Sequence, residues 1–204
     1  MTITYKLGNA LYLNITNACP CSCIFCLREK QDGVGDAASL WLEREPTPEE
    51  IKAALDACYP FEDMKEIVFC GYGEPMERAD IVIEISHYIK NMFTQKNKPA
   101  LPVRINTNGL VMLINPGFDI SRLAIVDTVS ISLNTDDAAE YMRVARPRFG
   151  EGSYEAMLSF AREANAYTTV IFTVVEGTMD PARLENCMRI AREMGVGFRL
   201  RPYE

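Results

Sequence analysis

Short apolar runs rich in β-branched residues alternate with longer segments of helical period along this chain. The expected strands are 10–16, 66–70, 102–107, 127–133, 168–175 and 196–201, and the expected helices are 48–58, 79–94, 136–144, 153–165 and 181–194. The first helix is expected to begin at Pro48, with a capping box of Thr47 and Glu50. Strands that alternate with helices pair in parallel through right-handed crossovers, which places the chain in the α/β class. This order restricts the possible folds more than any other property of the sequence.

The length decides between a closed and an open arrangement of these units. A full eight-unit barrel usually needs about 250 residues, whereas this chain has 204 residues and ends on its sixth expected strand. We therefore predict a partial (β/α)6 barrel, similar to a TIM barrel, with a parallel sheet that is open along one side. Segment 28–46 is polar and is expected to be a loop, and no linker divides the chain, so one domain over 1–204 is expected.

Composition and charge exclude several classes of protein. Hydrophobic residues make up 48% and charged residues 24% of the sequence, which is typical of a folded globular chain. The formal net charge of -7 repels nucleic acid and anionic membranes, so neither is an expected partner. The uncharged run from Leu7 to Leu27 contains asparagines, a proline and four cysteines, which excludes a membrane helix. No secretion signal opens the sequence, so a cytoplasmic location is expected.

The cysteines are concentrated in one short segment. Four of the seven lie within eight residues, while Cys58, Cys70 and Cys187 are dispersed and are expected in the core, with Cys70 on a buried strand. Without a secretion signal, such a cluster indicates metal binding or catalysis rather than a disulfide framework. The clustered residues are Cys19, Cys21, Cys23 and Cys26.

The cysteine loop directly follows the first expected strand, where α/β folds place their chemistry. Cys19, Cys23 and Cys26 form a C-x3-C-x2-C pattern that delivers three thiolates. Thiolates hold [4Fe-4S] clusters, and a loop with three ligands leaves one iron open. We therefore predict these three residues as iron ligands and leave the role of Cys21 open.

Other chemistries remain possible for this loop. A structural zinc site usually needs four ligands in two separated pairs, but the second pair is missing and His87 lies in an expected helix. Cys23 and Cys26 could also form a redox dithiol, although such pairs stand at a helix start without a third cysteine upstream. A non-catalytic iron-sulfur or zinc module, and an ordinary α/β barrel enzyme with an incidental cysteine loop, are the rival interpretations.

The cysteine spacing, with Phe25 before the last cysteine, resembles the radical S-adenosylmethionine (radical SAM) superfamily. Within it, the compact size and the Asn17-Ala18-Cys19-Pro20-Cys21-Ser22-Cys23-Ile24-Phe25-Cys26 loop look like the short TatD-associated radical SAM proteins. The resemblance implies a [4Fe-4S] cluster whose fourth iron chelates S-adenosylmethionine (SAM). It further implies reductive cleavage of SAM to a 5′-deoxyadenosyl radical, which abstracts hydrogen from a substrate.

Three later strand ends support this resemblance. The second strand leads into Gly73-Glu74-Pro75, similar to a family element that receives the methionine ammonium, although Tyr72 interrupts the glycine pair. The third ends in a turn similar to another family motif, with Thr107 and Asn108 as expected SAM contacts and Asn106 in place of an acidic residue seen in some members. The fourth carries Ser132 and Asn134 on one face, which implies contacts with the ribose.

The resemblance also suggests partners and further candidate residues. Flavodoxin or ferredoxin is the expected type of electron donor, and a laterally open barrel admits a peptide or protein segment as substrate. The charged residues at the later strand and helix ends have alternative interpretations as solvated surface groups, so their roles stay open. They are Arg143, Arg146, Glu176, Arg199 and Arg201.

Overall fold

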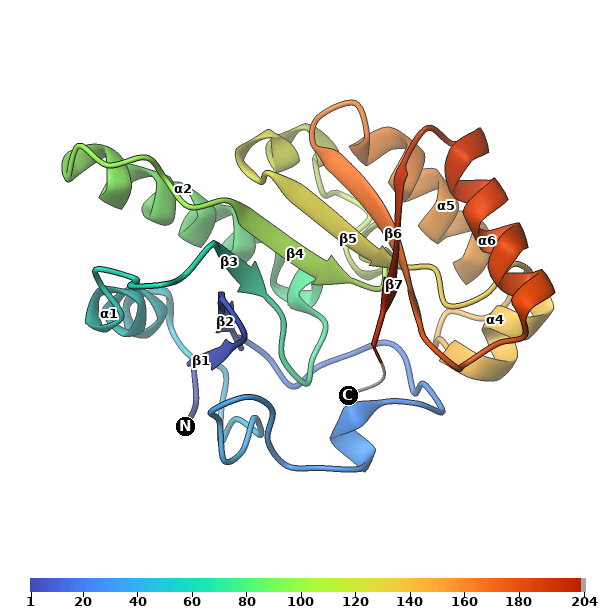
Figure 1. Cartoon of the computed structure of the whole chain (residues 1–204), viewed down its shortest axis with the longest axis horizontal. Coiled ribbons are helices and arrows are strands. Elements are labelled where there is room, and N and C mark those ends of the chain that lie inside the picture. The colour runs from blue at the N-terminus through green and yellow to red at the C-terminus, as the bar shows by residue number, and fades with distance from the viewer. Residues whose placement is uncertain (203–204) are drawn as a thin grey trace.

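The computed structural model describes residues 1–202 and contains one seven-stranded sheet with strand order β1-β2-β3-β4-β5-β6-β7 (Figure 1). Strands β2 to β7 pair in parallel, and the sheet does not close, which confirms the open α/β fold. The prediction of one domain over 1–204 stays a prediction, and its last two residues lie outside the described part. The strands are Thr4–Leu7, Ala10–Leu13, Glu66–Phe69, Val103–Thr107, Thr128–Ser132, Thr169–Val175 and Gly197–Arg201.

The N-terminal strand corrects the predicted order of elements. β1 pairs antiparallel with β2 through a turn at Gly8, whose φ of 58° lies in the left-handed region that glycine tolerates. The expectation of strict alternation between strands and helices is therefore wrong at this end. β1 covers the outer edge of β2, and Tyr5 and Tyr12 stack with ring centroids 5.0 Å apart. Four residues with one buried position gave too weak a periodic pattern to predict this strand.

The five expected helices are present within about two residues of their predicted ends, and α1 begins at Pro48 as predicted. Thr47 and Glu50 form the predicted capping box. The connection from β4 to β5 differs, because it holds only a four-residue helix and a 3-10 segment that the sequence did not predict. The α-helices are Pro48–Ala57, Ala79–Gln95, Val111–Ile114, Ala138–Ala145, Ser153–Ala164 and Pro181–Glu193 for α1 to α6, and the 3-10 helices are Leu27–Glu29, Pro75–Arg78 and Ile120–Ile125 for η1 to η3.

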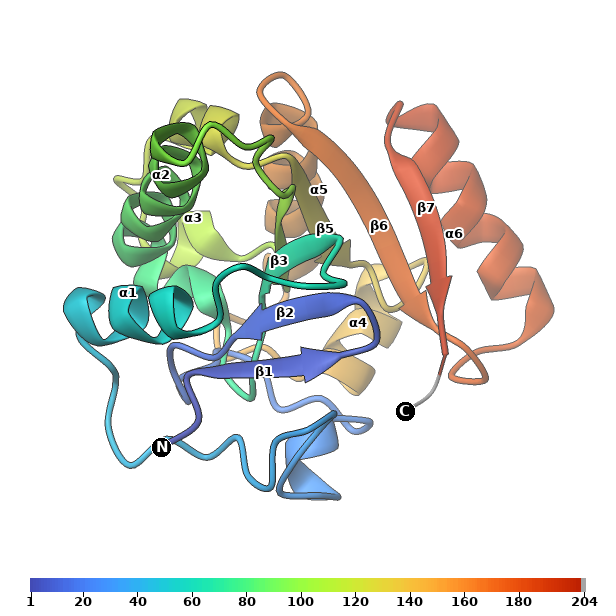
Figure 2. The same ribbon diagram turned by 60° about the vertical axis from the view of Figure 1, so that its left-hand side comes forward.

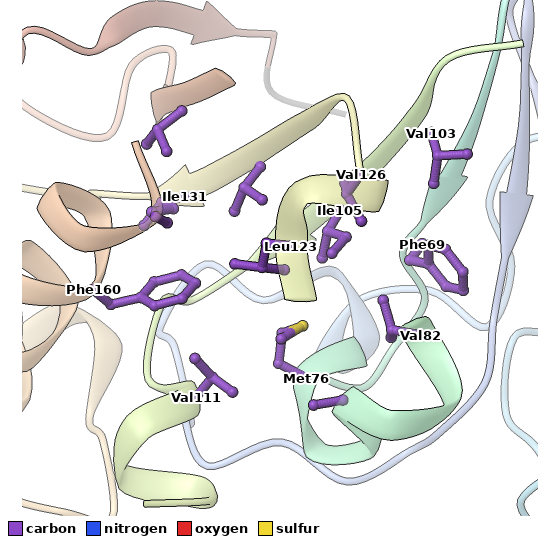
Figure 3. Packing of buried hydrophobic residues seen from close by; sticks show 14 of the residues in the cluster. Phe69, Met76, Val82, Val103, Ile105, Val111, Leu123, Val126, Ile131 and Phe160 are labelled. Atoms are coloured by element: carbon purple, nitrogen blue, oxygen red, sulfur yellow. The ribbon is translucent and has the colours of Figure 1, made fainter. Parts of the chain in front are cut away.

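The outer face of the sheet packs against these helices and forms the main core. In Figure 3, Ile105 of β4 lies between Phe69 of β3 and Leu123 of η3, Val103 of β4 lies above Phe69, and Val82 approaches from α2. All of these side chains are fully buried. Burial of one such side chain contributes about 1.5–3 kcal/mol, so this face supplies most of the apolar stabilisation.

The inner face of the same strands is polar. Because side chains alternate along a strand, Arg104 and Asn106 point away from the core that Val103 and Ile105 enter. The predicted loop 28–46 is confirmed apart from the short η1, and the chain after β2 lies at the end toward which β6 and β7 run (Figure 2). Within residues 1–202, no helix has the length and apolar character needed to cross a membrane.

Candidate active site

A cavity of about 420 Å³ lies between the cysteine loop, the segment after β3 and the inner face of β4 to β7. Its volume falls in the range of sites for small molecules, about 300–1,000 Å³. The cavity is at the carboxyl ends of the parallel strands, where the predicted site residues were expected. Of those residues, the ones that line it are Cys23, Phe25, Cys26 and Ser132.

The cysteine loop is fixed against the end of α4. The amide of Ser22 donates to the carbonyl of Ala145 (3.1 Å), and the amide of Ile24 donates to Val144 (3.0 Å). Cys21 forms an isolated antiparallel bridge with Pro147. These main-chain contacts determine the path of the loop, because each satisfies a polar group that would otherwise lack a partner.

The four thiols of the loop differ in environment. Cys19, Cys23 and Cys26 are half-buried, whereas Cys21 is 4% exposed and belongs to the core. Hydrogen bonding with Cys21 lowers the pKa of Cys19 and of Cys23 and raises the pKa of Cys21. Burial raises the pKa of Cys26. Cys21 thus differs from the three predicted ligands.

The side chains of the cysteine loop are not arranged around a common point as metal ligands would be. Among residues 1–202, no three His, Cys, Asp or Glu side chains are arranged as they would be around a metal ion. The donor set nevertheless suits an iron-sulfur cluster, because two of its three thiols are biased toward the thiolate form and two face the cavity. The dispersed residues Cys58, Cys70 and Cys187 are free thiols.

The turn after β3 is tied tightly to the cysteine loop. The amide of Glu74 donates to the carbonyl of Ala18 (2.8 Å). A Cβ at Gly73 would lie 2.3 Å from the carbonyl oxygen of Thr16, so only glycine allows this close approach. Pro75 is buried at the start of η2. This contact explains the small residue in the predicted motif.

Glu74 is buried, and its carboxylate has internal partners. Its Oε1 accepts from the Thr107 hydroxyl (2.7 Å) and from the Met76 amide (3.0 Å), and its Oε2 accepts from the Asn108 amide (2.7 Å). Burial raises the pKa of Glu74 to about 7, although these hydrogen bonds oppose the shift. The side chain does not line the cavity but joins the turns after β3 and β4.

Three other predicted SAM contacts, Thr107, Asn108 and Asn134, lie near the strand ends. They differ in how many of their polar atoms have hydrogen-bond partners. Thr107 also accepts from the Gly109 amide (3.0 Å), and Asn108 accepts from Leu110 (2.9 Å) in a side-chain turn. Two buried amide atoms, Asn108 Nδ2 and Asn134 Oδ1, have no hydrogen-bond partner. Asn134 also has a φ of 63°, in the left-handed region. Such unpaired groups are costly unless a ligand satisfies them.

The residues with open roles divide into two groups. Arg199 and Arg201 line the cavity from β7. Arg143 instead pairs with Glu140 on the exposed side of α4 (2.5 Å), and Glu176 is exposed after β6. Arg146 ends α4 with a φ of 47° and does not line the cavity.

Several cavity residues were not among the predicted contacts. Cys70 follows β3 and lines the cavity, so its expected position on a buried strand is wrong. Tyr72, which interrupts the glycine pair, lines the cavity and donates a hydrogen bond to the carbonyl of Gln31 in the long loop. Tyr12 and Arg104 line it from β2 and β4. The period-two alternation of polar residues along β4 and β7 was a signal that could have identified this wall.

The chain belongs to the Radical SAM superfamily, because that family's model matches residues 13–191. This match covers the cysteine loop, the turns after β3 and β4, and β5. The members of this superfamily are enzymes. No curated protein sequence matches the chain significantly.

Solved radical SAM structures share the fold at low sequence identity. Streptococcus suis SuiB bound to precursor peptide SuiA is 15% identical, with a TM-score of 0.70, and the match covers 97% of this chain and 40% of SuiB. TYW1 with a lysine-pyruvate adduct bound is 15% identical, with a TM-score of 0.61 and coverage of 98% and 66%. Native anSMEcpe with bound AdoMet is 15% identical, with a TM-score of 0.59 and coverage of 95% and 50%. The chain therefore spans two fifths of SuiB and about half of anSMEcpe.

Proposed function

We propose that the protein binds a [4Fe-4S] cluster through Cys19, Cys23 and Cys26 and uses SAM to start radical chemistry. The observation that carries this proposal is the position of the cysteine loop: it is held at the mouth of the cavity, with Cys23 and Cys26 facing inward. These three residues would hold a cluster that, once reduced, supplies the one electron needed to cleave SAM to methionine and a 5′-deoxyadenosyl radical.

The three proposed ligands are more exposed than Cys21, and two of them, Cys19 and Cys23, also differ from it in the direction of their pKa shift. A metal ligand must be a thiolate, and the lowered pKa of Cys19 and of Cys23 favours that form. Cys21 is turned into the core and has a raised pKa. We therefore assign Cys21 to positioning the loop rather than to iron.

The polar residues at the strand ends would hold and orient SAM. Asn108 Nδ2 and Asn134 Oδ1 offer a donor and an acceptor that nothing else satisfies, and Ser132 and Phe25 line the cavity. Glu74 acts indirectly, because its oxygens already bind Met76, Thr107 and the Asn108 amide. Its role is to keep the Gly73-Glu74-Pro75 turn beside the cysteine loop.

The substrate we propose is a peptide or protein segment that enters through the open side of the sheet. An open sheet supports this, as does the fold shared with SuiB, whose structure contains its precursor peptide. The similarity to TatD-associated proteins, a flavodoxin or ferredoxin as electron donor and a cytoplasmic location belong to the same proposal. Free thiols at all seven cysteines suit a reducing compartment.

Anaerobic reconstitution with iron and sulfide tests this function. The reconstituted protein should absorb as a [4Fe-4S] protein and, with dithionite and SAM, release 5′-deoxyadenosine. Cys23→Ala should abolish both signals, whereas the matched control Cys58→Ala should retain them, because Cys58 lies outside the cavity. A zinc-containing, colourless product, or a full cluster that yields no 5′-deoxyadenosine, would contradict the proposal.

A further inference from the structure

Four arginines line the cavity, Arg28 from η1 after the cysteine loop and three from the strands of its inner wall. Arg104 lies on β4, and Arg199 and Arg201 lie on β7, all among the residues that line it. They share this face because residues two apart along a strand point the same way. The chain as a whole carries a net charge of -7, so this positive wall is a local exception to the overall charge.

Only one of the three strand arginines is neutralised by an acidic partner. Arg104 forms two hydrogen bonds with the carboxylate of Glu66, at 2.9 and 2.7 Å. Arg199 has a single side-chain partner, the hydroxyl of Ser130 at 3.1 Å. Among residues 1–202, no acidic side chain pairs with Arg199 or Arg201, and the Nε atoms of both are buried without a hydrogen-bond partner.

This arrangement costs free energy unless an anion pairs with the guanidinium groups. Guanidinium groups bury well when a carboxylate or phosphate accepts two parallel hydrogen bonds, and poorly otherwise. Burial and the nearby charges of Arg104 and Arg201 lower the pKa of Arg199. Glu66, whose charge acts on Arg199, is already paired with Arg104. An anion placed between the β7 arginines would relieve both the repulsion and the missing hydrogen bonds.

We propose that Arg199 and Arg201 bind an anionic group of the substrate, a carboxylate or a phosphate, and so fix the substrate in the cavity beside the cysteine loop. That the bound molecule is the substrate rests on the proposed radical function. The anion site itself rests on the geometry of the wall and can be tested without turnover. Arg104 shapes the wall, but its charge is offset by its pairing with Glu66.

Cys70 provides a reporter inside the same cavity. It lines the cavity, and burial raises its pKa, although a hydrogen bond with Asn106 and the charges of Arg201 and Arg104 oppose the shift. Cys58 follows α1 outside the cavity and serves as a matched thiol. Anionic iodoacetate and neutral iodoacetamide alkylate the same thiolate, so the ratio of their rates measures the local potential independently of the pKa of each thiol.

The experiment uses the anaerobically reconstituted protein and peptide-level mass spectrometry. The iodoacetate to iodoacetamide rate ratio should be about 10-fold higher at Cys70 than at Cys58, since a cleft of one sign of charge concentrates the opposite ion by that order. The double variant Arg199→Gln/Arg201→Gln should lower the rate ratio at Cys70 to the rate ratio at Cys58. The double variant Arg199→Lys/Arg201→Lys should keep the wild-type rate ratio at Cys70. Glu66→Gln, which removes the acidic partner of Arg104, should raise the rate ratio at Cys70 above that of the wild type.

Occupancy is measured by protection of Cys70 from iodoacetamide. Inorganic phosphate and malonate are compared with chloride at equal ionic strength, and the anion that protects better identifies the preferred group. Equal rate ratios at the two cysteines, or protection no better than with chloride, would overturn the proposal. So would a loss of SAM affinity in the glutamine double variant, because the arginines would then hold SAM. Failure of SAM cleavage in the unaltered protein would instead count against the proposed radical function.

Discussion

The two faces of the same sheet behave in opposite ways. On the outer face, Val103, Ile105 and Phe172 are fully buried among helices. On the inner face, Arg199 and Arg201 have buried Nε atoms with no partner. One face is filled by apolar side chains, whereas the other has buried polar groups that lack a partner within the described residues. The stability of the protein therefore resides mainly in the outer face, and its binding capacity in the inner face.

The largest effect is expected from a truncation on the outer face. Phe172→Ala removes a fully buried ring from β6 and should lower the free energy of unfolding by about 3–5 kcal/mol through lost burial and a new cavity. Urea denaturation followed by circular dichroism measures this change. A loss below about 1 kcal/mol would show that the outer face collapses around the gap and is less tightly packed than it looks.

The free energy of unfolding should depend on pH through Glu74, because this is the only buried carboxylate within residues 1–202. Its titration sharpens the comparison between the two faces of the sheet. Its pKa is raised to about 7 in the folded protein, above the ordinary 4.5, so the folded state binds the proton more tightly. The stabilising contribution of the protonated form is fully present below pH 4.5 and is lost as the pH rises to 7, with a magnitude up to about 3 kcal/mol.

Urea unfolding of the wild type and of Glu74→Gln across pH 4.5 to 8 isolates this contribution. The free-energy difference between them should shift against the wild type as the pH rises through that interval, while other carboxylates cancel in the comparison. Two parallel stability curves would mean that Glu74 keeps an ordinary pKa despite its burial.

Gly73 lies where the turn after β3 meets the cysteine loop. Gly73→Ala should destabilise the protein by about 1–3 kcal/mol, because its Cβ would lie 2.3 Å from the Thr16 carbonyl oxygen. It should also reduce the iron content after reconstitution, since the loop must move. Gly152→Ala is the matched control: it has open space and a φ of -70°. Similar iron content in the two variants would show that the loop adjusts freely.

The smallest effect on stability is expected on the inner face. Arg201→Gln removes an unpaired charge from the cavity wall and should change the free energy of unfolding by no more than about 0.5 kcal/mol. Thermal unfolding monitored by circular dichroism measures this. A loss as large as that of Phe172→Ala would break the distinction between the two faces, because it would make Arg201 part of the structural framework.

Much of the fold could be predicted because its signals are local. The capping box at Thr47 and the β-branched run of β6 depend on neighbours within a few residues. β1 could not be predicted in this way, because its pairing with β2 and the stacking of Tyr5 on Tyr12 are contacts between strands. The short helix α3 was missed because its four residues are too few for a helical period to emerge.

The candidate site was predicted in part for the same reason. The cysteine spacing and the glycine of the Gly73-Glu74-Pro75 turn are local patterns, and both lie at the carboxyl end of the sheet as expected. The actual partners of Glu74 were not predictable, since Thr107 and Asn108 reach it from the next strand. Cys70 was misplaced because its burial depends on whether a cavity opens beside it.

The sequence by itself determined the α/β class, the order of the parallel strands and the residue types available for iron, because periodicity, capping and spacing are encoded along the chain. The tertiary structure decided which of these groups face one another. It buried Cys21 beside the more exposed proposed ligands, turned Glu74 inward, and brought Arg104 of β4 beside Arg199 and Arg201 of β7. Only the folded sheet sets these distances, because they join residues far apart in sequence through burial and register.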